Sequence, residues 1–274
     1  MAISGVSIFV VGIALLVSVP LSQQNEEVHL KFSYSGETGP DKWGSLKPEF
    51  STCSTGKLQS PVNIVTKDVI YNPKLQPLNR DYRTSNSTLI NHGYSIGLFY
   101  GSDKVGVMIH DGKNYTLKQV HWHSPSEHTI NGIRYPLELH QVHIADDGSI
   151  SVVGVLYNYG APDLLLLQIK SKLDELAKEA CGEDEIAKIP IGHMGTKYLR
   201  RGAFKYYRYV GSLTTPPCTQ NVTWTIIAKV REVSKEQIEA LTAPLEGSCK
   251  SNSRPVQALY GRKIELYNAM PNKI

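Results

Sequence analysis

The chain lacks charge at its start, because none of its first 22 residues is Lys, Arg, His, Asp or Glu. An apolar run from Val6 to Val19 fills most of this stretch and is followed by Pro20. The run has the length of a signal-peptide core and is short for a bilayer span, although the usual basic residues before such a core are missing. We therefore expect residues 1–22 to be a signal peptide cleaved between about 18 and 25, with an uncleaved anchor as the alternative.

Long apolar runs are absent from the remainder, so we expect no membrane insertion once the leader is removed. Repeats, low-complexity tracts and linkers are also missing, and residues 23–274 are expected to form one domain. Lys and Arg are scattered and the net charge is only +4, which argues against nucleic-acid binding. The sequence does not indicate an oligomeric state.

Cysteine is scarce, with four residues in the whole chain. This number suits an oxidising compartment but permits more than one pairing. N-glycosylation sequons begin at Asn86, Asn114 and Asn221. Together with the leader they predict a glycoprotein of the secretory pathway that is secreted or extracellular.

Short strand-like runs punctuated by Gly, Asn and Asp dominate the chain, so a mainly β fold is expected. Two segments depart from this pattern. Asp163 to Ala180 carries leucines at helical spacing, and Ser234 to Leu241 begins with a capping box formed by Ser234 and Gln237. Both are expected to be packing helices without a functional role.

The histidines are concentrated in two strand-like segments. His121 and His123 are separated by one residue, which places both side chains on the same face of a strand. His140 follows in the segment 137–144, which the turn at 146–148 connects to a further strand. Three imidazoles and one open position are the ligand set of a catalytic zinc, whereas a structural zinc fills all four positions. We predict a catalytic Zn²⁺ site at these three histidines.

Two polar side chains share the faces of these histidines. Period-two alternation places Gln119 with His121 and His123, and Glu138 with His140. An amide or carboxylate oxygen in such a position accepts the second N–H of a ligand imidazole and fixes its tautomer and orientation. We expect Gln119 and Glu138 to serve in this way.

Several blocks of the sequence resemble the α-class carbonic anhydrases, and most closely the plant branch of that family. The blocks follow the family order over residues 36 to 265 and comprise residues 42–44, 59–64, 119–129, 138–143, 209–218, 222–224 and 254–257. The resemblance implies a single domain with a large, mostly antiparallel, twisted sheet of ten strands and few short surface helices. It also implies a lyase that reversibly hydrates CO2 to bicarbonate and a proton at a zinc ion.

The resemblance further implies roles for individual residues. Thr214 together with Glu127 would orient the attacking oxygen, and Thr215 would line the bicarbonate site. The apolar wall that receives CO2 would comprise Val142, Val152, Leu213, Val222 and Trp224. A disulfide between Cys53 and Cys218 would brace the loop that carries the threonines.

The chain departs from the family at the proton shuttle. A histidine is usual at that position, and Tyr94 occupies it here. Tyrosine has an ordinary pKa of about 10 and relays protons poorly from a group that titrates near neutrality. His92, two residues earlier, is the substitute shuttle to test. We therefore expect hydration whose turnover is limited by proton removal.

Two other functions stay open. Some relatives have lost a zinc ligand and become storage or binding proteins with weak or no catalysis; this chain keeps all three ligands, but Tyr94 is a step in that direction. His121 and His123 followed by Glu127 also resemble the metal motif of the cupins. That second resemblance is weaker, because Tyr115 stands where a cupin has glycine and no second cupin block follows.

The resemblance leaves two further points open. It assigns no partner to Cys181 or Cys249. It also permits a final compartment other than the cell exterior, namely the chloroplast stroma reached through the secretory pathway.

Overall fold

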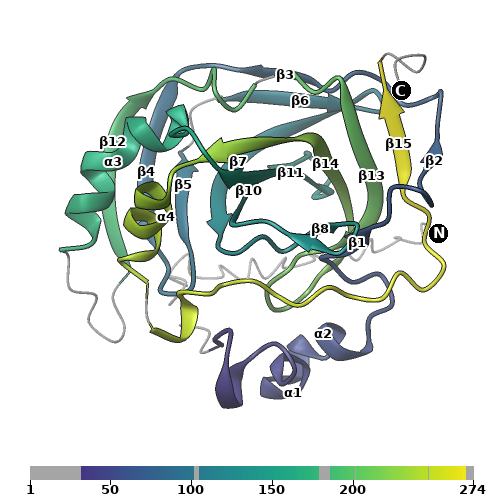
Figure 1. Cartoon of the computed structure of the whole chain (residues 1–274), viewed down its shortest axis with the longest axis horizontal. Coiled ribbons are helices and arrows are strands. Elements are labelled where there is room, and N and C mark those ends of the chain that lie inside the picture. The colour runs from purple at the N-terminus through teal and green to yellow at the C-terminus, as the bar shows by residue number, and fades with distance from the viewer. Residues whose placement is uncertain (1–31, 102–104, 179–185, 201, 246, 270–274) are drawn as a thin grey trace, which may run out of the picture. The chain divides into compact units, whose positions relative to one another are not determined.

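A large twisted β-sheet forms the centre of the protein (Figure 1). The computed structural model describes residues 32–101, 105–178, 186–200, 202–245 and 247–269. The expected leader at residues 1–22 and Cys181 lie outside these ranges.

One continuous path of hydrogen-bonded strands runs in the order β12-β4-β5-β7-β10-β11-β14-β13-β15-β2. The strands of this path are β2 (Ile70–Tyr71), β4 (Ser85–Asn91), β5 (Ile96–Tyr100), β7 (Lys113–His123), β10 (Leu137–Ile144), β11 (Ile150–Tyr159), β12 (Ala187–Met194), β13 (Lys205–Ser212), β14 (Gln220–Val233) and β15 (Glu265–Asn268). A side branch of β3 (Asn79–Tyr82) and β6 (Gly106–His110) joins the path at β7. A separate small sheet contains β1 (Asn63–Ile64), β8 (Thr129–Ile130) and β9 (Ile133–Arg134).

The expectation of a mainly β fold with a mostly antiparallel sheet is confirmed. Among the described strands of the large sheet, only the pairs β11–β14 and β15–β2 are parallel. The sheet has twelve strands where the resemblance implied ten. The side branch explains the difference, because β7 is long enough for its first half to pair with β6 and its second half with β5.

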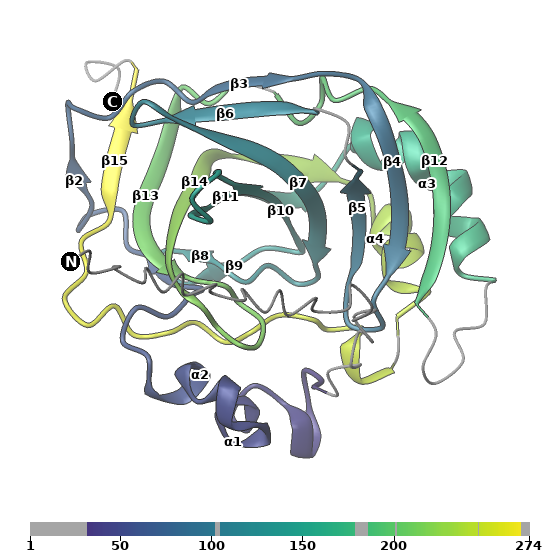
Figure 2. The ribbon, with the colours of Figure 1, turned by 180° about the vertical axis from the view of Figure 1, so that it is seen from behind.

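The helices are short and lie outside the sheet, as expected. They are α1 (Trp43–Leu46), α2 (Thr52–Thr55), α3 (Leu164–Leu176) and α4 (Lys235–Thr242), together with the 3-10 turns η1 (Gly36–Thr38), η2 (Pro48–Phe50) and η3 (Gly247–Cys249). Helices α3 and α4 lie together beside β4 and β12 (Figures 1 and 2). Within the described residues no helix is long and apolar enough to cross a membrane.

Both predicted helices are present where the sequence placed them. Asp163 caps α3 by accepting from two backbone N–H groups, and the helix ends at Leu176, its last buried residue, because the following Ala177 and Lys178 are exposed. The predicted capping box of α4 is formed, with Ser234 and Gln237 each accepting from the other's backbone N–H at 3.3 Å.

Successive residues of the central strands point to opposite faces, and each face has its own apolar cluster. On β14, Ile227 packs in the cluster that includes the buried faces of α3 and α4. Trp224 and Ile226 pack in the second cluster, together with Val152 and Tyr209. The predicted zinc ligands lie on the side of this second cluster, since the ring of His140 is 4.8 Å from that of Trp224.

Candidate metal centre

Antiparallel pairing of β7 with β10 brings the three predicted ligands together. His140 lies directly opposite His121 in the register of the two strands. The ring of His123 is 4.9 Å from that of His121 and 4.7 Å from that of His140. One nitrogen of each imidazole lies within 4.8 Å of the other two, which is the arrangement that three ligands around one metal ion require.

The outward-facing nitrogens of two of these imidazoles are held by the side chains that the sequence predicted. His121 Nδ1–H donates to Gln119 Oε1, and His140 Nε2–H donates to Glu138 Oε1, both at 2.8 Å. With these protons turned outward, His121 Nε2 and His140 Nδ1 carry lone pairs that face each other at 3.3 Å. Gln119 and Glu138 therefore have the geometry expected of them.

The acceptor for the third imidazole is a residue that the sequence reasoning missed. His123 Nδ1–H donates to the backbone carbonyl of Asn252 at 2.6 Å. The Asn252 side chain fixes this carbonyl, because its Nδ2 donates to the Tyr94 carbonyl at 3.0 Å and its Oδ1 accepts from the Ser124 N–H at 2.8 Å. Every residue offers a backbone carbonyl, so the sequence contains no signal for this contact beyond the nearby block at 254–257.

The environment of the three imidazoles favours their neutral forms. Burial lowers the pKa of His121 well below its ordinary value, lowers that of His123 to about 4 and also lowers that of His140. Neutral imidazoles are the form that binds a metal. His123 Nε2 is buried without a hydrogen-bond partner among the described residues, which is costly unless a cation meets its lone pair. The donor set therefore fits a zinc ion.

Glu138 anchors a second buried histidine behind the ligands. Its Oε1 accepts from His128 Nδ1–H at 2.7 Å, and its Oε2 accepts the backbone N–H groups of Glu127 and His128. Burial favours the neutral carboxyl, but the charges and hydrogen bonds of His128 and His140 outweigh it and hold the pKa of Glu138 well below its usual range. His128, Glu138 and His140 also lie within metal-binding distance, but hydrogen bonds already join their facing atoms. His128 and Glu138 therefore hold the imidazole of His140 in position.

Glu127 and Thr214 lie beside the ligand cluster. Glu127 is fully buried, its Oε2 is 3.5 Å from His123 Nε2 and its Oε1 accepts the Arg254 N–H at 2.9 Å. Burial raises the pKa of Glu127 to about 7, against the lowering effects of His140, of the Thr214 side-chain hydrogen bond and of the Arg254 N–H. The Thr214 side chain thus acts on the Glu127 carboxyl group, and the orienting role of this pair stays a prediction.

The threonine loop (residues 213–219) is tied to the N-terminal part of the domain. The implied disulfide between Cys53 and Cys218 is formed, with the two Cα atoms 5.0 Å apart. Gln59 Nε2 donates to the Cys218 carbonyl at 3.2 Å, and the buried Arg254 guanidinium donates to the Cys53 carbonyl at 2.8 Å. These contacts fix the loop at Cys218, on the C-terminal side of Thr214. Cys249 is also buried.

The residues of the implied apolar wall come together in one cluster. Its members are Val142, Val152, Val222 and Trp224, which are buried, and Leu213, which packs partly exposed against them. Thr215 lies half-buried in the same loop as Thr214. The wall thus lies next to the ligand histidines, on the His140 side.

Tyr94 and His92 lie at another edge of the site. Tyr94 packs in an aromatic cluster, with its ring 4.7 Å from that of Phe32. His92 stacks on Tyr94 at 5.7 Å, and its charge lowers the pKa of His121.

A β domain whose central strands present three neutral, converging imidazoles beside an apolar wall defines a class of metal-dependent catalyst. The family model for eukaryotic-type carbonic anhydrase matches residues 38–268. The chain is 42% identical over 265 residues to alpha carbonic anhydrase 7 of Arabidopsis thaliana, covering 96% of this chain and 94% of that protein. The chain belongs to the eukaryotic-type, or α, carbonic anhydrase family.

Solved structures agree with this assignment. The crystal structure of dioscorin complexed with ascorbate superposes with a TM-score of 0.84 at 32% identity and covers 88% of this chain and 100% of that one. The α-carbonic anhydrase from Thermovibrio ammonificans, in complex with the inhibitor sulfanilamide, superposes with a TM-score of 0.76 at 36% identity, covering 85% and 98% of the two chains. The fold and the lyase class are those of a carbonic anhydrase.

Proposed function

We propose that the chain catalyses the zinc-dependent, reversible hydration of carbon dioxide to bicarbonate and a proton. The observation that carries this proposal is the convergence of three imidazole nitrogens, with His123 Nε2 buried and without a hydrogen-bond partner among the described residues. The chemistry that zinc supplies when held by three neutral imidazoles is the activation of water as a nucleophile at neutral pH.

Thr214 and Glu127 orient that nucleophile. The Glu127 carboxyl group accepts the Arg254 N–H, and the Thr214 side chain lowers its pKa, which supports a pairing of the two side chains. When the Thr214 hydroxyl proton is committed to Glu127, its oxygen is left as an acceptor only. Thr214 would then accept a hydrogen bond from the attacking oxygen and so fix its orientation toward the substrate.

The apolar wall receives CO2. A small apolar molecule is held by contact with apolar side chains and by exclusion of water, and needs few hydrogen bonds. Val142, Val152, Val222 and Trp224 provide such a surface next to His140. Thr215 receives the polar product at the exposed end of the loop.

Removal of the proton limits turnover in this proposal. Tyr94 stands at the shuttle position and packs on Phe32, which suits an aromatic wall better than a relay. The charge of His92 acts on His121, so His92 is the better relay through water. Small buffers then carry the proton into solution.

A second candidate function is binding with weak or no catalysis. The structural likeness to dioscorin, which is complexed with ascorbate in its crystal structure, favours it. The complete set of three histidines and the Thr214–Glu127 contact favour the enzyme. Zinc content and CO2 hydration together distinguish the two.

We further propose that the protein follows the secretory route and acts outside the cell, with the chloroplast stroma as the alternative destination. The sequon residues Asn86, Asn114 and Asn221 are all exposed, as glycan acceptors must be. The Cys53–Cys218 disulfide suits an oxidising compartment.

Stopped-flow CO2 hydration, with zinc content measured on the same sample, tests the proposed activity. Thr214→Val is expected to keep its zinc and lose about a hundredfold in turnover, because it removes the oriented hydroxyl. Thr84→Val, at an exposed threonine outside the site, is the matched control and is expected to keep full activity. A zinc-loaded wild-type protein without activity, or a Thr214→Val variant as fast as the wild type, would contradict the proposal.

A further inference from the structure

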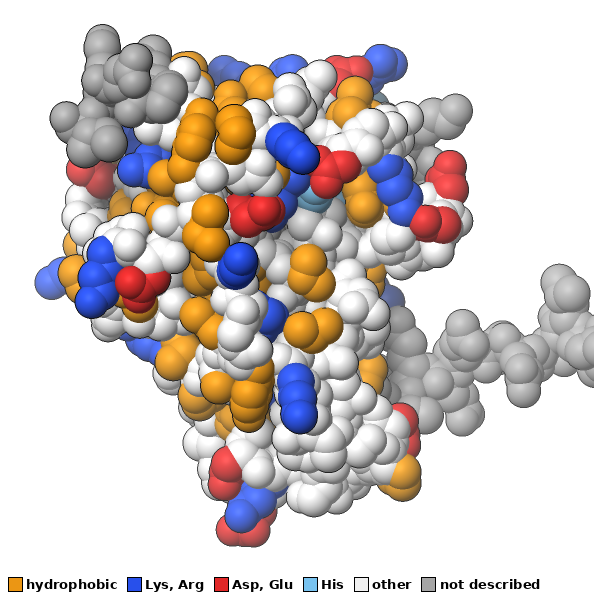
Figure 3. Space-filling view, turned by 90° about the vertical axis from the view of Figure 1, so that its right-hand side faces the viewer, with side chains coloured by type: hydrophobic (Ala, Val, Ile, Leu, Met, Phe, Trp, Pro, Cys, Tyr) orange, Lys and Arg blue, Asp and Glu red, His pale blue; other side chains and the backbone are white. Residues whose placement is uncertain are grey.

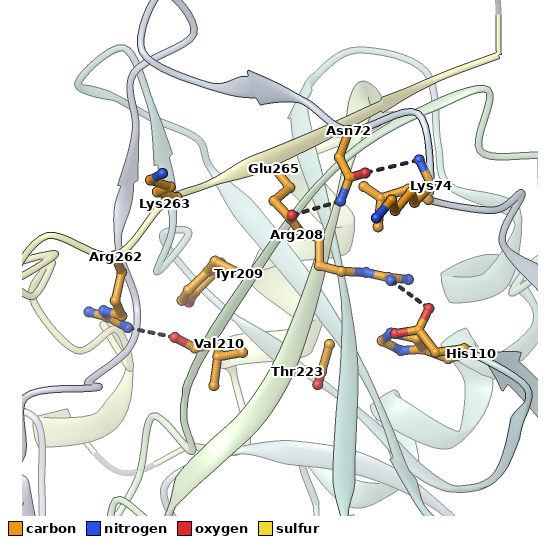
Figure 4. Close-up of a pocket in the computed structure, with 12 residues that line it drawn as sticks. Asn72, Lys74, His110, Arg208, Tyr209, Val210, Thr223, Arg262, Lys263 and Glu265 are labelled. Carbon is orange, nitrogen blue, oxygen red and sulfur yellow. Dashed lines mark hydrogen bonds and ion pairs between the residues drawn. The ribbon is translucent and has the colours of Figure 1, made fainter.

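A second cavity lies on the sheet away from the ligand histidines. It has a volume of about 590 Å³, within the range of about 300–1,000 Å³ typical of small-molecule sites. Its lining comes from the segment after β2, the β6–β7 turn, β13, β14 and the segment that leads into β15 (Figure 4). Charged side chains of both signs gather with apolar ones on the side of the molecule that carries β15 and β2 (Figure 3).

Strand alternation separates this cavity from the metal centre. Arg208 and Val210 on β13 flank Tyr209, and Thr223 precedes Trp224 on β14. The Tyr209 hydroxyl lies 2.7 Å from His128 Nε2, on the metal side of the sheet. Arg208, Val210 and Thr223 therefore point to the opposite side.

The cavity also contains two carboxylates, of which Asp111 is paired with a cation and Glu265 is bonded to a neutral amide. Asp111 accepts from Arg208 Nη1 at 3.2 Å and lies 2.9 Å from His110 Nε2. Glu265 accepts from Asn72 Nδ2 at 2.7 Å. Among the described residues, neither carboxylate forms an ion pair with Lys74, Arg262 or Lys263.

Three other cations of the cavity keep their charge. Lys74 and Lys263 are exposed and form no ion pair with any described residue. Arg262 donates only to the backbone carbonyls of Gln59, Val210, Ala258 and Leu259, which solvate its charge without neutralising it. In addition, the Nε–H of Arg208, a residue only 7% exposed, is buried without a hydrogen-bond partner among the described residues.

These cations lie at two ends of the cavity. Lys74 and Arg208 are at one end, beside His110, and Arg262 and Lys263 are at the other (Figure 4). Between them the lining is apolar at Val210. A ligand that satisfies both ends needs negative charge at each and a short carbon skeleton between them.

We propose that this cavity binds a small organic polyanion that carries two or more oxyanion groups, either carboxylates or phosphates. The unpaired cations supply the attraction, and guanidinium and ammonium groups are the side chains that recognise such groups. A bicarbonate ion carries a single oxyanion group, so it does not have the separate negative charge that each end of the cavity calls for. Tyr209 is shared between this cavity, which it lines, and the metal side of the sheet, where its hydroxyl contacts His128. The proposal does not rest on the proposed hydration activity.

Amide chemical-shift titration of the isotope-labelled, zinc-loaded protein tests the proposal. The probes are tricarballylate for the carboxylate class and propane-1,3-diol bisphosphate for the phosphate class, with glycerol as the neutral control. We expect saturable shifts at Lys74, Asp111, Val210 and Lys263 that weaken as salt is added. A response to one probe alone supports the proposal and assigns the oxyanion class.

The double variant Lys74→Glu/Lys263→Glu is expected to weaken binding about tenfold or more, because it replaces attraction by repulsion at both ends. Both lysines are exposed, so the variant is expected to fold. Lys57→Glu/Lys229→Glu makes the same change of net charge at exposed lysines away from the cavity and is expected to bind as the wild type does. The proposal is overturned by shifts confined to the ligand histidines, by equal weakening in both double variants, or by glycerol binding as well as the anions.

Discussion

At the scale of single residues, the geometry of the metal centre depends on the group that accepts a hydrogen bond from the second ring nitrogen of each ligand imidazole. Gln119 and Glu138 hold two of these nitrogens through side chains whose positions follow from strand alternation, so the sequence predicted them. The third is held by the carbonyl of Asn252, more than a hundred residues away from His123. Such a contact depends on tertiary packing and on an atom that all residues share, so no local pattern reveals it.

Glu138 has two imidazoles to support, and its replacement tests this role. Glu138→Gln places an amide between His128 and His140, and one amide oxygen cannot accept from all the donors that the carboxylate satisfies. Zinc affinity is expected to fall about 10–100-fold, as measured by competition with a chromophoric chelator. Glu239→Gln on the exposed face of α4 is the control, and unchanged affinity in Glu138→Gln would refute the role.

We propose that Tyr94 occupies the shuttle position, where the family resemblance implies a histidine. Tyr94→His is expected to raise turnover in dilute buffer by about tenfold or more and to reduce the response to added imidazole. Tyr94→Phe keeps the packing on Phe32 and is expected to behave as the wild type. A wild-type enzyme that is already fast in dilute buffer and indifferent to imidazole would show that the proton leaves by another route.

Elements differ in how far local sequence determines them. The start of α4 follows from a capping box between residues three apart, and α3 from leucines at helical spacing, so both were predicted. The threonine loop has no such local signal. Its position comes from the Cys53–Cys218 bridge, from Gln59 and from Arg254, all distant in sequence, and only the family resemblance anticipated the bridge.

Removal of the bridge tests what holds the threonine loop. Cys53→Ala/Cys218→Ala is expected to lower the free energy of unfolding by about 2–5 kcal/mol in denaturant titrations. CO2 hydration is expected to slow as well, because Thr214 loses its fixed position. Ser54→Ala, an exposed neighbour of Cys53, controls for changes in α2. Full activity in the bridge variant would show that Gln59 and Arg254 suffice to hold the loop.

At the scale of the whole molecule, the sequence predicted the type of sheet but not its pairings. Alternation along β7 and β10 identified strands and faces, yet it did not reveal that β7 pairs with β5 and β6 on one edge. Nor did it reveal that β11 runs parallel to β14 in the middle of the sheet. These pairings join segments far apart in the chain, and their register is set by packing of the whole core.

Buried histidines make stability depend on pH. Burial lowers the pKa of His143 to about 3, so the unfolded chain binds this proton at a higher pH than the folded one. The free energy of unfolding therefore falls as pH decreases from about 6.5 toward 3, by at most about 1.4 kcal/mol per pH unit from this residue. His143→Gln is expected to flatten the profile by that amount, and the exposed His193→Gln is the control for loss of a histidine. Identical profiles for His143→Gln and the wild type would contradict the assignment.

Stepwise addition of zinc to the chelator-stripped protein, with stopped-flow CO2 hydration recorded at each step, tests the central claim most directly. The three converging imidazoles predict that activity rises in proportion to bound zinc and reaches a plateau at one zinc per chain. Zinc binding that saturates without any hydration activity, or hydration that persists in the zinc-free protein, would contradict the central claim.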